Sequence, residues 1–233
     1  MVITAFAPAR AGRIDGSIKR AASVTSRNLT ALQSLYWLMI VSGFFEPLLY
    51  LLSIGVGVGK LIGTIHLSDG SEVGYATFVA PAMLASSAMT GAMTESTFNF
   101  FAKMKWSKVF DGVLATPVRP MEVAFGELMW AMARGALYAI FFLGIMVIKG
   151  YTSPGLAVIA FFAAMLIGFA FGAVGMAVST TIRGWQDFDL VATVQVAMFL
   201  FSATFAPLSA YHSVVARVII ELSPLYQSVQ LVR

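Results

Sequence analysis

The sequence predicts an all-α protein that crosses a membrane several times. Of its 233 residues, 59% are hydrophobic and only 11% are charged, and the mean hydropathy is +0.85. Soluble domains usually carry about 25% charged residues, so this chain has too little polar surface to be soluble. Several apolar runs are long enough to cross a bilayer as helices. The ten-residue alternation that is typical of a transmembrane β-barrel is not visible.

The same composition argues against several other classes of function. The chain has no cysteine, so we expect no disulfide, thiol nucleophile or thiolate metal site. His66 and His212 lack companion ligands at metal-binding spacing, so we also expect no metal site. There is no HExxH motif or Ser/His pair to support an intramembrane enzyme. The net charge of +4 is explained by basic cytoplasmic loops and does not require a nucleic-acid partner.

The run GVGVGK is not an ATP site, although it is rich in glycine. A Walker A loop needs a glycine five residues before the Gly-Lys pair and a hydroxyl residue after it. Ile54 and Leu61 stand at those two positions. We therefore expect ATP and Mg²⁺ to bind to a partner subunit, with no cofactor on this chain.

Five spans and three flanking segments are predicted within one transmembrane domain, residues 17–233. The spans cover residues 35–58, 75–98, 123–148, 155–182 and 190–205. Residues 1–16 are expected to be a disordered cytoplasmic tail without a cleaved signal peptide. The amphipathic residues 17–34 predict a helix in the membrane interface, or alternatively a solvated tail. Residues 207–230 are too polar and broken for a span, and predict one or two short re-entrant or interfacial helices.

The polar stretch between the second and third spans predicts a short amphipathic helix over residues 103–116. Its apolar residues fall on one helical face: Trp106, Val109, Phe110, Val113 and Leu114. Thr116-Pro117 ends it, because proline lacks an N–H and disfavours helical geometry in the residue before it. Such a helix either lies flat on lipid or docks into another protein. We interpret it as a lever that receives force from a soluble partner.

Polar residues inside the first two spans predict part of a substrate path. Glu46-Pro47 interrupts the first span, where a carboxylate should face protein or water. Phe44 and Tyr50 flank this pair. The second span is rich in hydroxyl residues, among them Ser87 and Thr90. Such residues either line a path or serve ordinary helix packing.

Arg134 lies well inside the third span and needs a partner. We expect an intramembrane ion pair with Glu95 or Glu127; contact with substrate is the other interpretation. In the fourth span, Gly168, Gly172 and Gly175 predict a thin face for close helix packing.

Basic residues in short loops predict the orientation. They concentrate in the N-terminal segment and in the loop at residues 103–119, whereas the alternate loops hold only Lys60 and Lys149. The N-terminus and the predicted lever are therefore expected in the cytoplasm, which leaves the end of the fifth span outside.

Four stretches resemble the membrane subunit of ABC-2 type exporters, in the subgroup with nodulation lipo-oligosaccharide and daunorubicin-type drug exporters. They are EPLLYLLSIGVGVGK, SKVFDGVLATPVRPMEVAFGELMW, LFSATFAPLS and ELSPLYQSVQLVR. The amphipathic helix that ends in L-x-x-P-V, with Gly126-Glu127 downstream, is the most specific of these features.

The resemblance implies a type V exporter-like domain in the bacterial cytoplasmic membrane, with six spans. It identifies residues 103–116 as the coupling helix and residues 208–230 as an outward-facing re-entrant region. It implies a homodimer or heterodimer of permeases with two ABC nucleotide-binding subunits. A sixth span is expected where the sequence stops at Arg233.

The implied function is ATP-driven export of a hydrophobic or amphiphilic substrate: a drug, a lipid or a lipid-linked saccharide. The alternative is a channel or secondary transporter without an ATPase, which would need a polar path or an internal repeat. In the dimer, we expect the first and fifth spans to meet and the second to line the space between protomers.

Overall fold

The structure is a computed structural model that describes residues 14–31, 41, 45, 49–66 and 72–233. Residues 1–13 of the predicted tail and half of the first span lie outside the described residues, as do Phe44 and Glu46. Residues 14–16 of the predicted disordered tail are helical, so that part of the prediction is wrong.

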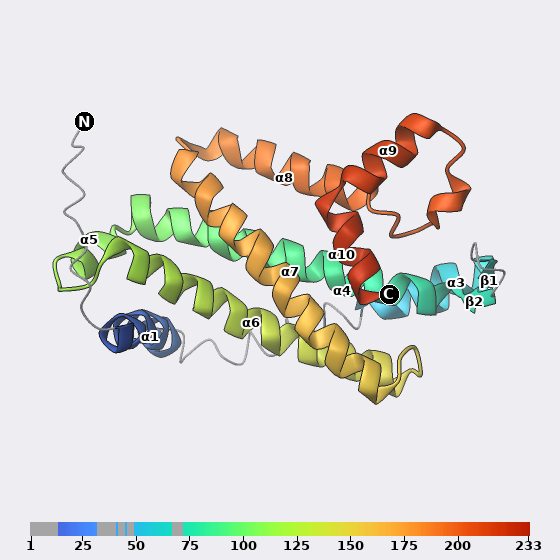
Figure 1. Ribbon diagram of the computed structural model, residues 1–233, viewed down its shortest axis with the longest axis horizontal. Helices are drawn as coiled ribbons and strands as arrows, with labels where there is room; N and C mark the ends of the chain where they lie inside the picture. Colours follow the sequence, from blue (N-terminus) through green and yellow to red (C-terminus); the bar gives the residue numbers. More distant parts are fainter. Residues whose placement is uncertain (1–13, 32–40, 42–44, 46–48, 67–71) are drawn as a thin grey trace.

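Three long helices form the body of the molecule and lie side by side along its long axis (Figure 1). They are α4 (Tyr75–Thr94), α6 (Pro120–Ile148) and α7 (Pro154–Thr181). Two π-helical turns, η3 (Glu95–Asn99) and η4 (Ala102–Trp106), continue α4, so that this helical segment runs over Tyr75–Trp106. In the described part of the chain, these three segments are long and apolar enough to cross a membrane. The helices predicted at residues 75–98, 123–148 and 155–182 are confirmed, with shifted ends.

The core lies where the three helices meet, and the glycines of α7 bring the helices close. Leu84, Phe142 and Ala164 are buried together from α4, α6 and α7, respectively. A Cβ at Gly172 would lie 2.8 Å from Leu128 Cδ1, and one at Gly175 only 2.1 Å from Ser96 Oγ. The thin face predicted on this helix is therefore confirmed, because side chains there would collide with α6 and η3.

The chain after α7 forms a fourth long helix and a pair of short ones. These are α8 (Trp185–Leu200), the 3₁₀ turn η5 (Leu208–Ala210), α9 (Val214–Leu222) and α10 (Pro224–Val232). The fifth predicted span, residues 190–205, has the wrong bounds. Helix α8 starts earlier because the Asp187 carboxylate accepts the Arg183 backbone N–H (2.7 Å) at its first turn. Helix α10 packs back against α4 and α7, burying Leu225 and Val229, so the prediction of short helices in this region is confirmed.

The end of the molecule near α9 also carries a small hairpin. Helical residues η2 (Ser53–Val58) and α3 (Gly59–Ile62) lead into strands β1 (Thr64–His66) and β2 (Glu72–Gly74). The strands are antiparallel, with Ile65 opposite Val73. Gly63 has a φ of +74° and ends α3, so it serves a turn.

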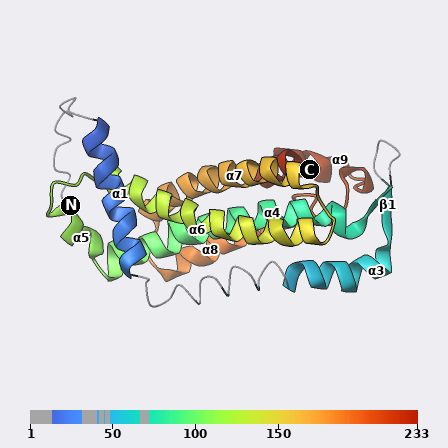
Figure 2. The same ribbon diagram turned by 90° about the horizontal axis from the view of Figure 1, so that it is seen from below.

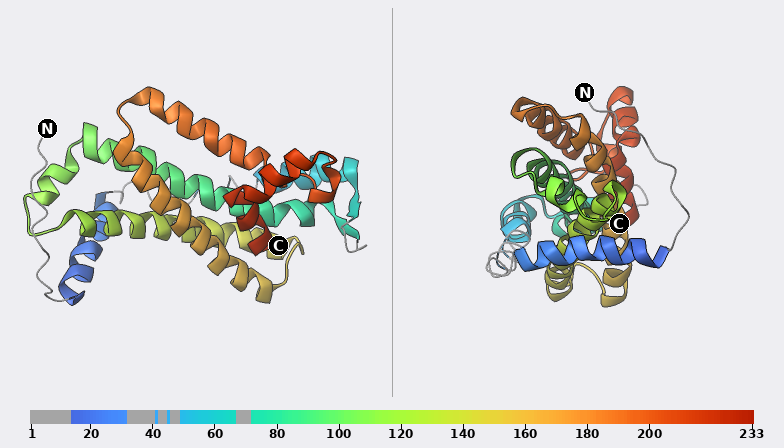
Figure 3. Two further views of the ribbon diagram at one scale, coloured as in Figure 1. Left: turned by 45° about the horizontal axis from the view of Figure 1, so that its top comes forward. Right: turned by 90° about the vertical axis from the view of Figure 1, so that its left-hand side faces the viewer.

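The opposite end carries α1 (Ile14–Ala31) and α5 (Val109–Leu114). Helix α1 lies across the ends of the long helices rather than along them (Figures 2 and 3). It begins before residue 17, which was the predicted start of the interfacial helix, and it packs mainly against α6.

The continuous helix predicted over residues 103–116 is wrong. Its first residues belong to the end of the α4 segment, and α5 contains only six residues. Lys108 separates them, because its φ of 48° is left-handed and breaks the helix. Phe110 then turns inward, where its ring centroid lies 5.0 Å from that of Phe100.

Candidate functional site

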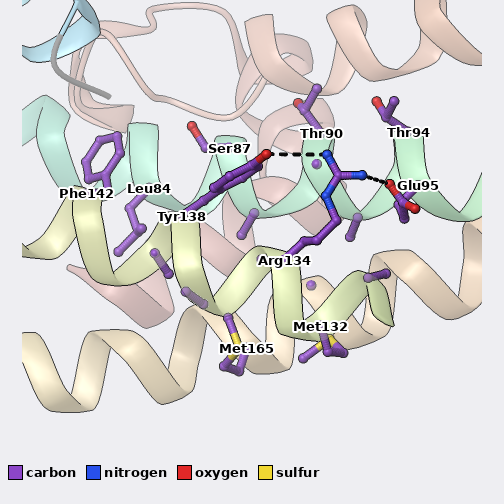
Figure 4. Close-up of a pocket in the computed structure, with 18 of the residues that line it drawn as sticks. Leu84, Ser87, Thr90, Thr94, Glu95, Met132, Arg134, Tyr138, Phe142 and Met165 are labelled. Carbon is purple, nitrogen blue, oxygen red and sulfur yellow. Dashed lines mark hydrogen bonds and ion pairs between the residues drawn. The ribbon is translucent and has the colours of Figure 1, made fainter. Parts of the chain in front are cut away.

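A cavity of about 380 Å³ opens between α4, α6 and α7 (Figure 4). Ser87, Thr90 and Thr94 line it from α4, and Arg134 and Tyr138 line it from α6. Its size lies within the range of small-molecule pockets, about 300–1,000 Å³. The structure thus brings the predicted path residues Ser87 and Thr90 into one cavity with the predicted charged residues Glu95 and Arg134.

Arg134 is held by two polar neighbours inside this cavity. Its Nη1 contacts the Glu95 carboxylate, and its Nη2 donates to the Tyr138 hydroxyl at 3.3 Å. The Asn99 amide donates to the same carboxylate at 2.8 Å. The third donor, Arg134 Nε, is buried and has no acceptor among the described residues. A buried donor without an acceptor is costly, so the site favours a ligand that can accept a hydrogen bond.

The remaining walls of the cavity are apolar. Leu84, Phe142 and Met165 line it away from the arginine. A molecule with one polar end and one apolar body would therefore find a matching environment for both parts.

Tyr50 does not belong to this cavity. Its side chain is 44% exposed and lies outside the cavity's lining. Tyr138 is a lining residue that sequence reasoning missed. Its position four residues after Arg134 was the available signal, because residues at that spacing share a helical face.

Glu127 belongs to a different network. Its carboxylate accepts Lys103 Nζ at 2.6 Å and Arg27 Nη2 at 3.1 Å, and its side chain is only 4% exposed. Arg134 pairs with Glu95 instead. One buried carboxylate on α6 therefore ties together α1, the end of the α4 segment and α6, close to the start of α5.

Glu122 forms a second bond between α1 and α6. Its two oxygens accept Arg20 Nε and Nη2, both at 2.7 Å, and one of them also accepts the Ser17 hydroxyl. The hydrogen bond from Arg20 to this carboxylate raises the pKa of Arg20 above its ordinary value. The paired geometry is the strong, bidentate form of an arginine–carboxylate contact.

Gly126 lies between these two carboxylates and allows α1 to approach α6. A Cβ there would lie 2.6 Å from both the Ala21 carbonyl oxygen and Val24 Cβ. The Thr25 hydroxyl donates to the Gly126 carbonyl at 2.9 Å across the same contact. The Gly126-Glu127 pair thus has a structural role, which is to seat α1 on α6.

Replacing Gly126 with alanine is expected to push α1 away from α6, because the new methyl group meets backbone that cannot rotate aside. We expect a loss of about 1–3 kcal/mol in the free energy of unfolding. The midpoint of thermal unfolding of the purified protein checks this. Gly144→Ala is the matched control on the same helix, because open space surrounds its Cβ position. An equal midpoint for both variants would contradict the close α1–α6 contact.

The residues predicted for coupling separate into inward and outward groups. Phe110 is buried, and Val109 and Val113 are half-buried. Trp106 is 44% exposed but stacks on Trp185 of the same chain, with ring centroids 4.4 Å apart. Leu114 is 43% exposed on the outer side of α5. Of this set, Leu114 is the residue best placed to meet another protein.

Comparison with known proteins gives a consistent family match. A family model described as ABC-2 type transporter matches residues 22–233. The protein named Nodulation protein J of Rhizobium leguminosarum bv. trifolii is 28% identical over 212 residues, which cover 91% of this chain and 79% of that protein. Nodulation protein J of Azorhizobium caulinodans is 25% identical over 214 residues, covering 91% and 82%, respectively. No solved structure matches the chain significantly.

Proposed function

The chain belongs to the ABC-2 type transporter family, and on this premise we propose that it is the membrane-spanning permease subunit of an ATP-driven exporter. The observation that carries the proposal is the cavity between α4, α6 and α7, which has a polar end at Arg134 and apolar walls. That arrangement supports a hydrophobic or amphiphilic cargo: a drug, a lipid or a lipid-linked saccharide.

ATP hydrolysis is assigned to a partner, an ABC nucleotide-binding subunit that holds ATP and Mg²⁺. We propose a complex of two such subunits and two permeases, in a bacterial cytoplasmic membrane. The exposed apolar residues of α8, including Leu190, Val194 and Leu200, support the fifth span as a contact between permeases. The contact of the first span stays a prediction. A purified complex whose mass does not contain two copies of each subunit would contradict this stoichiometry.

We propose that the end of the molecule that carries α1 and α5 faces the cytoplasm. Both lie at one end of the long helices (Figure 1). Lys103 and Lys105 belong to η4, and Lys108 directly precedes α5. Clusters of lysine and arginine favour the cytoplasmic side. The ATPase would therefore approach α5, where Leu114 is the exposed apolar residue.

Leu114→Asp is the sharpest test of this function. The side chain points outward, so the permease should keep its thermal midpoint, while the added charge should prevent a helix-in-groove contact. We expect the variant to lose co-purification with its ATPase and to lose ATP-driven export.

Two other variants serve as controls for Leu114→Asp. Leu222→Asp changes a 77% exposed leucine on α9, at the other end of the molecule, and should retain both activities. Phe110→Asp should unfold the local core and lower the thermal midpoint, so its loss of export would reflect folding. Normal export by a Leu114→Asp protein that still recruits its ATPase would refute coupling through α5.

A further inference from the structure

A second cavity, of about 670 Å³, lies where the α4 segment ends and where α7 turns into α8. It is lined mainly by Lys105, Trp106, Thr180, Thr181, Arg183 and Trp185. All of these residues lie at the ends of long apolar helices or in the link between them, which places the cleft at one boundary of the membrane-spanning region. Neither the cargo cavity nor the α1–α6 contacts use it.

One wall of the cleft is an aromatic platform. Trp106 and Trp185 stack with an interplanar angle of 23°, and the ring of Phe98 packs against both. The two tryptophans remain 44% and 61% exposed despite these contacts. Tryptophan is enriched at the level of lipid head groups because its ring is apolar and its N–H is polar. This platform is therefore suited to the glycerol and upper acyl region of a lipid.

Two cations also line the cleft, and no carboxylate among the described residues neutralises them. Lys105 and Arg183 are exposed, and neither side chain forms an ion pair with a carboxylate in the described part of the chain. Arg20, Arg27 and Lys103, at the same end of the molecule, do form such pairs. The nearby Asp187 carboxylate accepts backbone N–H groups at the start of α8.

Two hydroxyl groups complete the cleft. Thr180 and Thr181 donate to the carbonyls of Ala177 and Val178, each at 2.7 Å. Their oxygens can still accept a hydrogen bond, which fits a ligand that carries hydroxyl groups beside its anionic group.

We propose that this cleft binds the head group of an anionic phospholipid that bears hydroxyl groups, such as phosphatidylglycerol. The phosphate lies between Lys105 and Arg183, the glycerol hydroxyls donate to the threonine oxygens, and the lipid backbone rests on the tryptophan pair. Basic pockets between spans on the cytoplasmic side are known to suit such head groups. The site is independent of the exported cargo, and it lies next to the break at Lys108 that precedes α5.

The test uses the purified complex of this chain with its ATPase in neutral detergent, titrated with short-chain phosphatidylglycerol and phosphatidylcholine. Binding is followed by tryptophan fluorescence and by the rise of the thermal midpoint with ligand concentration. We expect phosphatidylglycerol to bind about tenfold more tightly than phosphatidylcholine, because two cations face a head group with a net negative charge, whereas the choline group of phosphatidylcholine cancels the charge of its phosphate. The double variant Lys105→Gln/Arg183→Gln should lose most of this preference, and only the part that comes from the threonine oxygens should remain. Lys149→Gln removes an exposed cation at the other end of α6 and should keep the preference.

Three outcomes would overturn the proposal. The first is an unchanged lipid preference in the double variant. The second is binding of glycerol phosphate as tightly as the lipid, which would mark a site for a soluble phosphate. The third is loss of the ATPase subunit from the double variant without any change in lipid preference, which would mark a protein-binding surface. If the Leu114→Asp variant loses export but keeps its lipid preference, the lipid site and the contact with the ATPase are independent of each other.

Discussion

Replacing Glu127 with alanine is expected to lower the free energy of unfolding by about 3 kcal/mol, because both of its partners lose a buried carboxylate. Lys103 and Arg27 are 24% and 34% exposed, so water compensates them only in part. We also expect export to be lost, since α1 and the end of the α4 segment are no longer tied to α6. Thermal unfolding of the purified protein and export from vesicles measure the two effects.

A matched control and a double variant sharpen this result. Glu221→Ala removes an exposed carboxylate on α9 and should leave the midpoint unchanged. Glu127→Gln combined with Lys103→Gln should be less destabilising than the sum of the single changes, because fewer charges are left unpaired. Strict additivity would show that the Glu127–Lys103 contact contributes nothing to stability.

Arg134→Ala is expected to have the second largest effect. It leaves the Glu95 carboxylate, whose side chain is 10% exposed, with the Asn99 amide as its one remaining side-chain donor among the described residues. The expected cost is several kcal/mol, on the order of 3, as for other broken buried pairs. The thermal midpoint should therefore fall, and the amount of protein in the membrane should fall with it.

A variant that lacks both charges shows whether the Arg134–Glu95 pair only stabilises the fold or also selects the cargo. Arg134→Met with Glu95→Gln leaves no buried charge and should recover most of the thermal midpoint. Because the cavity then lacks its cationic end, the less polar amphiphiles should be exported in preference when several compete for export. A recovered midpoint with unchanged competition would show that the pair only holds α4 to α6 and does not touch cargo.

The long helices could be predicted because each leaves a strong local signal. The apolar runs are more than twenty residues long, Pro120 and Pro154 mark the starts of α6 and α7, and Gly150 follows the end of α6. The thin face of α7 was visible for a similar reason, since three glycines recur at helical spacing. Family resemblance supplied the general function, and the match over residues 22–233 confirms the family.

The coupling segment could not be predicted in the same way. Its apolar residues fit one face only if a regular helix continues through Lys108, and a single left-handed residue ends that regularity. The sequence also did not show which carboxylate pairs with Arg134, because its spacing along the chain allows a contact with either Glu95 or Glu127. Only the packing of α1 and α4 against α6 decides between them. The lipid-facing cleft joins residues about eighty positions apart, such as Trp106 and Trp185, and no local pattern connects them.

The two π-helical turns at Glu95–Asn99 and Ala102–Trp106 have a consequence for related sequences. A π-turn holds one residue more than the α-helical turn it replaces. Losing one residue there restores an ordinary turn and leaves the helix on either side in place. In a regular helix, one residue more or less would move everything downstream by about 1.5 Å and rotate it by about 100°, but the wide turn takes up the extra residue locally. We therefore expect homologues that are one residue shorter in this segment to keep α4, Trp106 and α5 in the same arrangement and to lack only the wide turn.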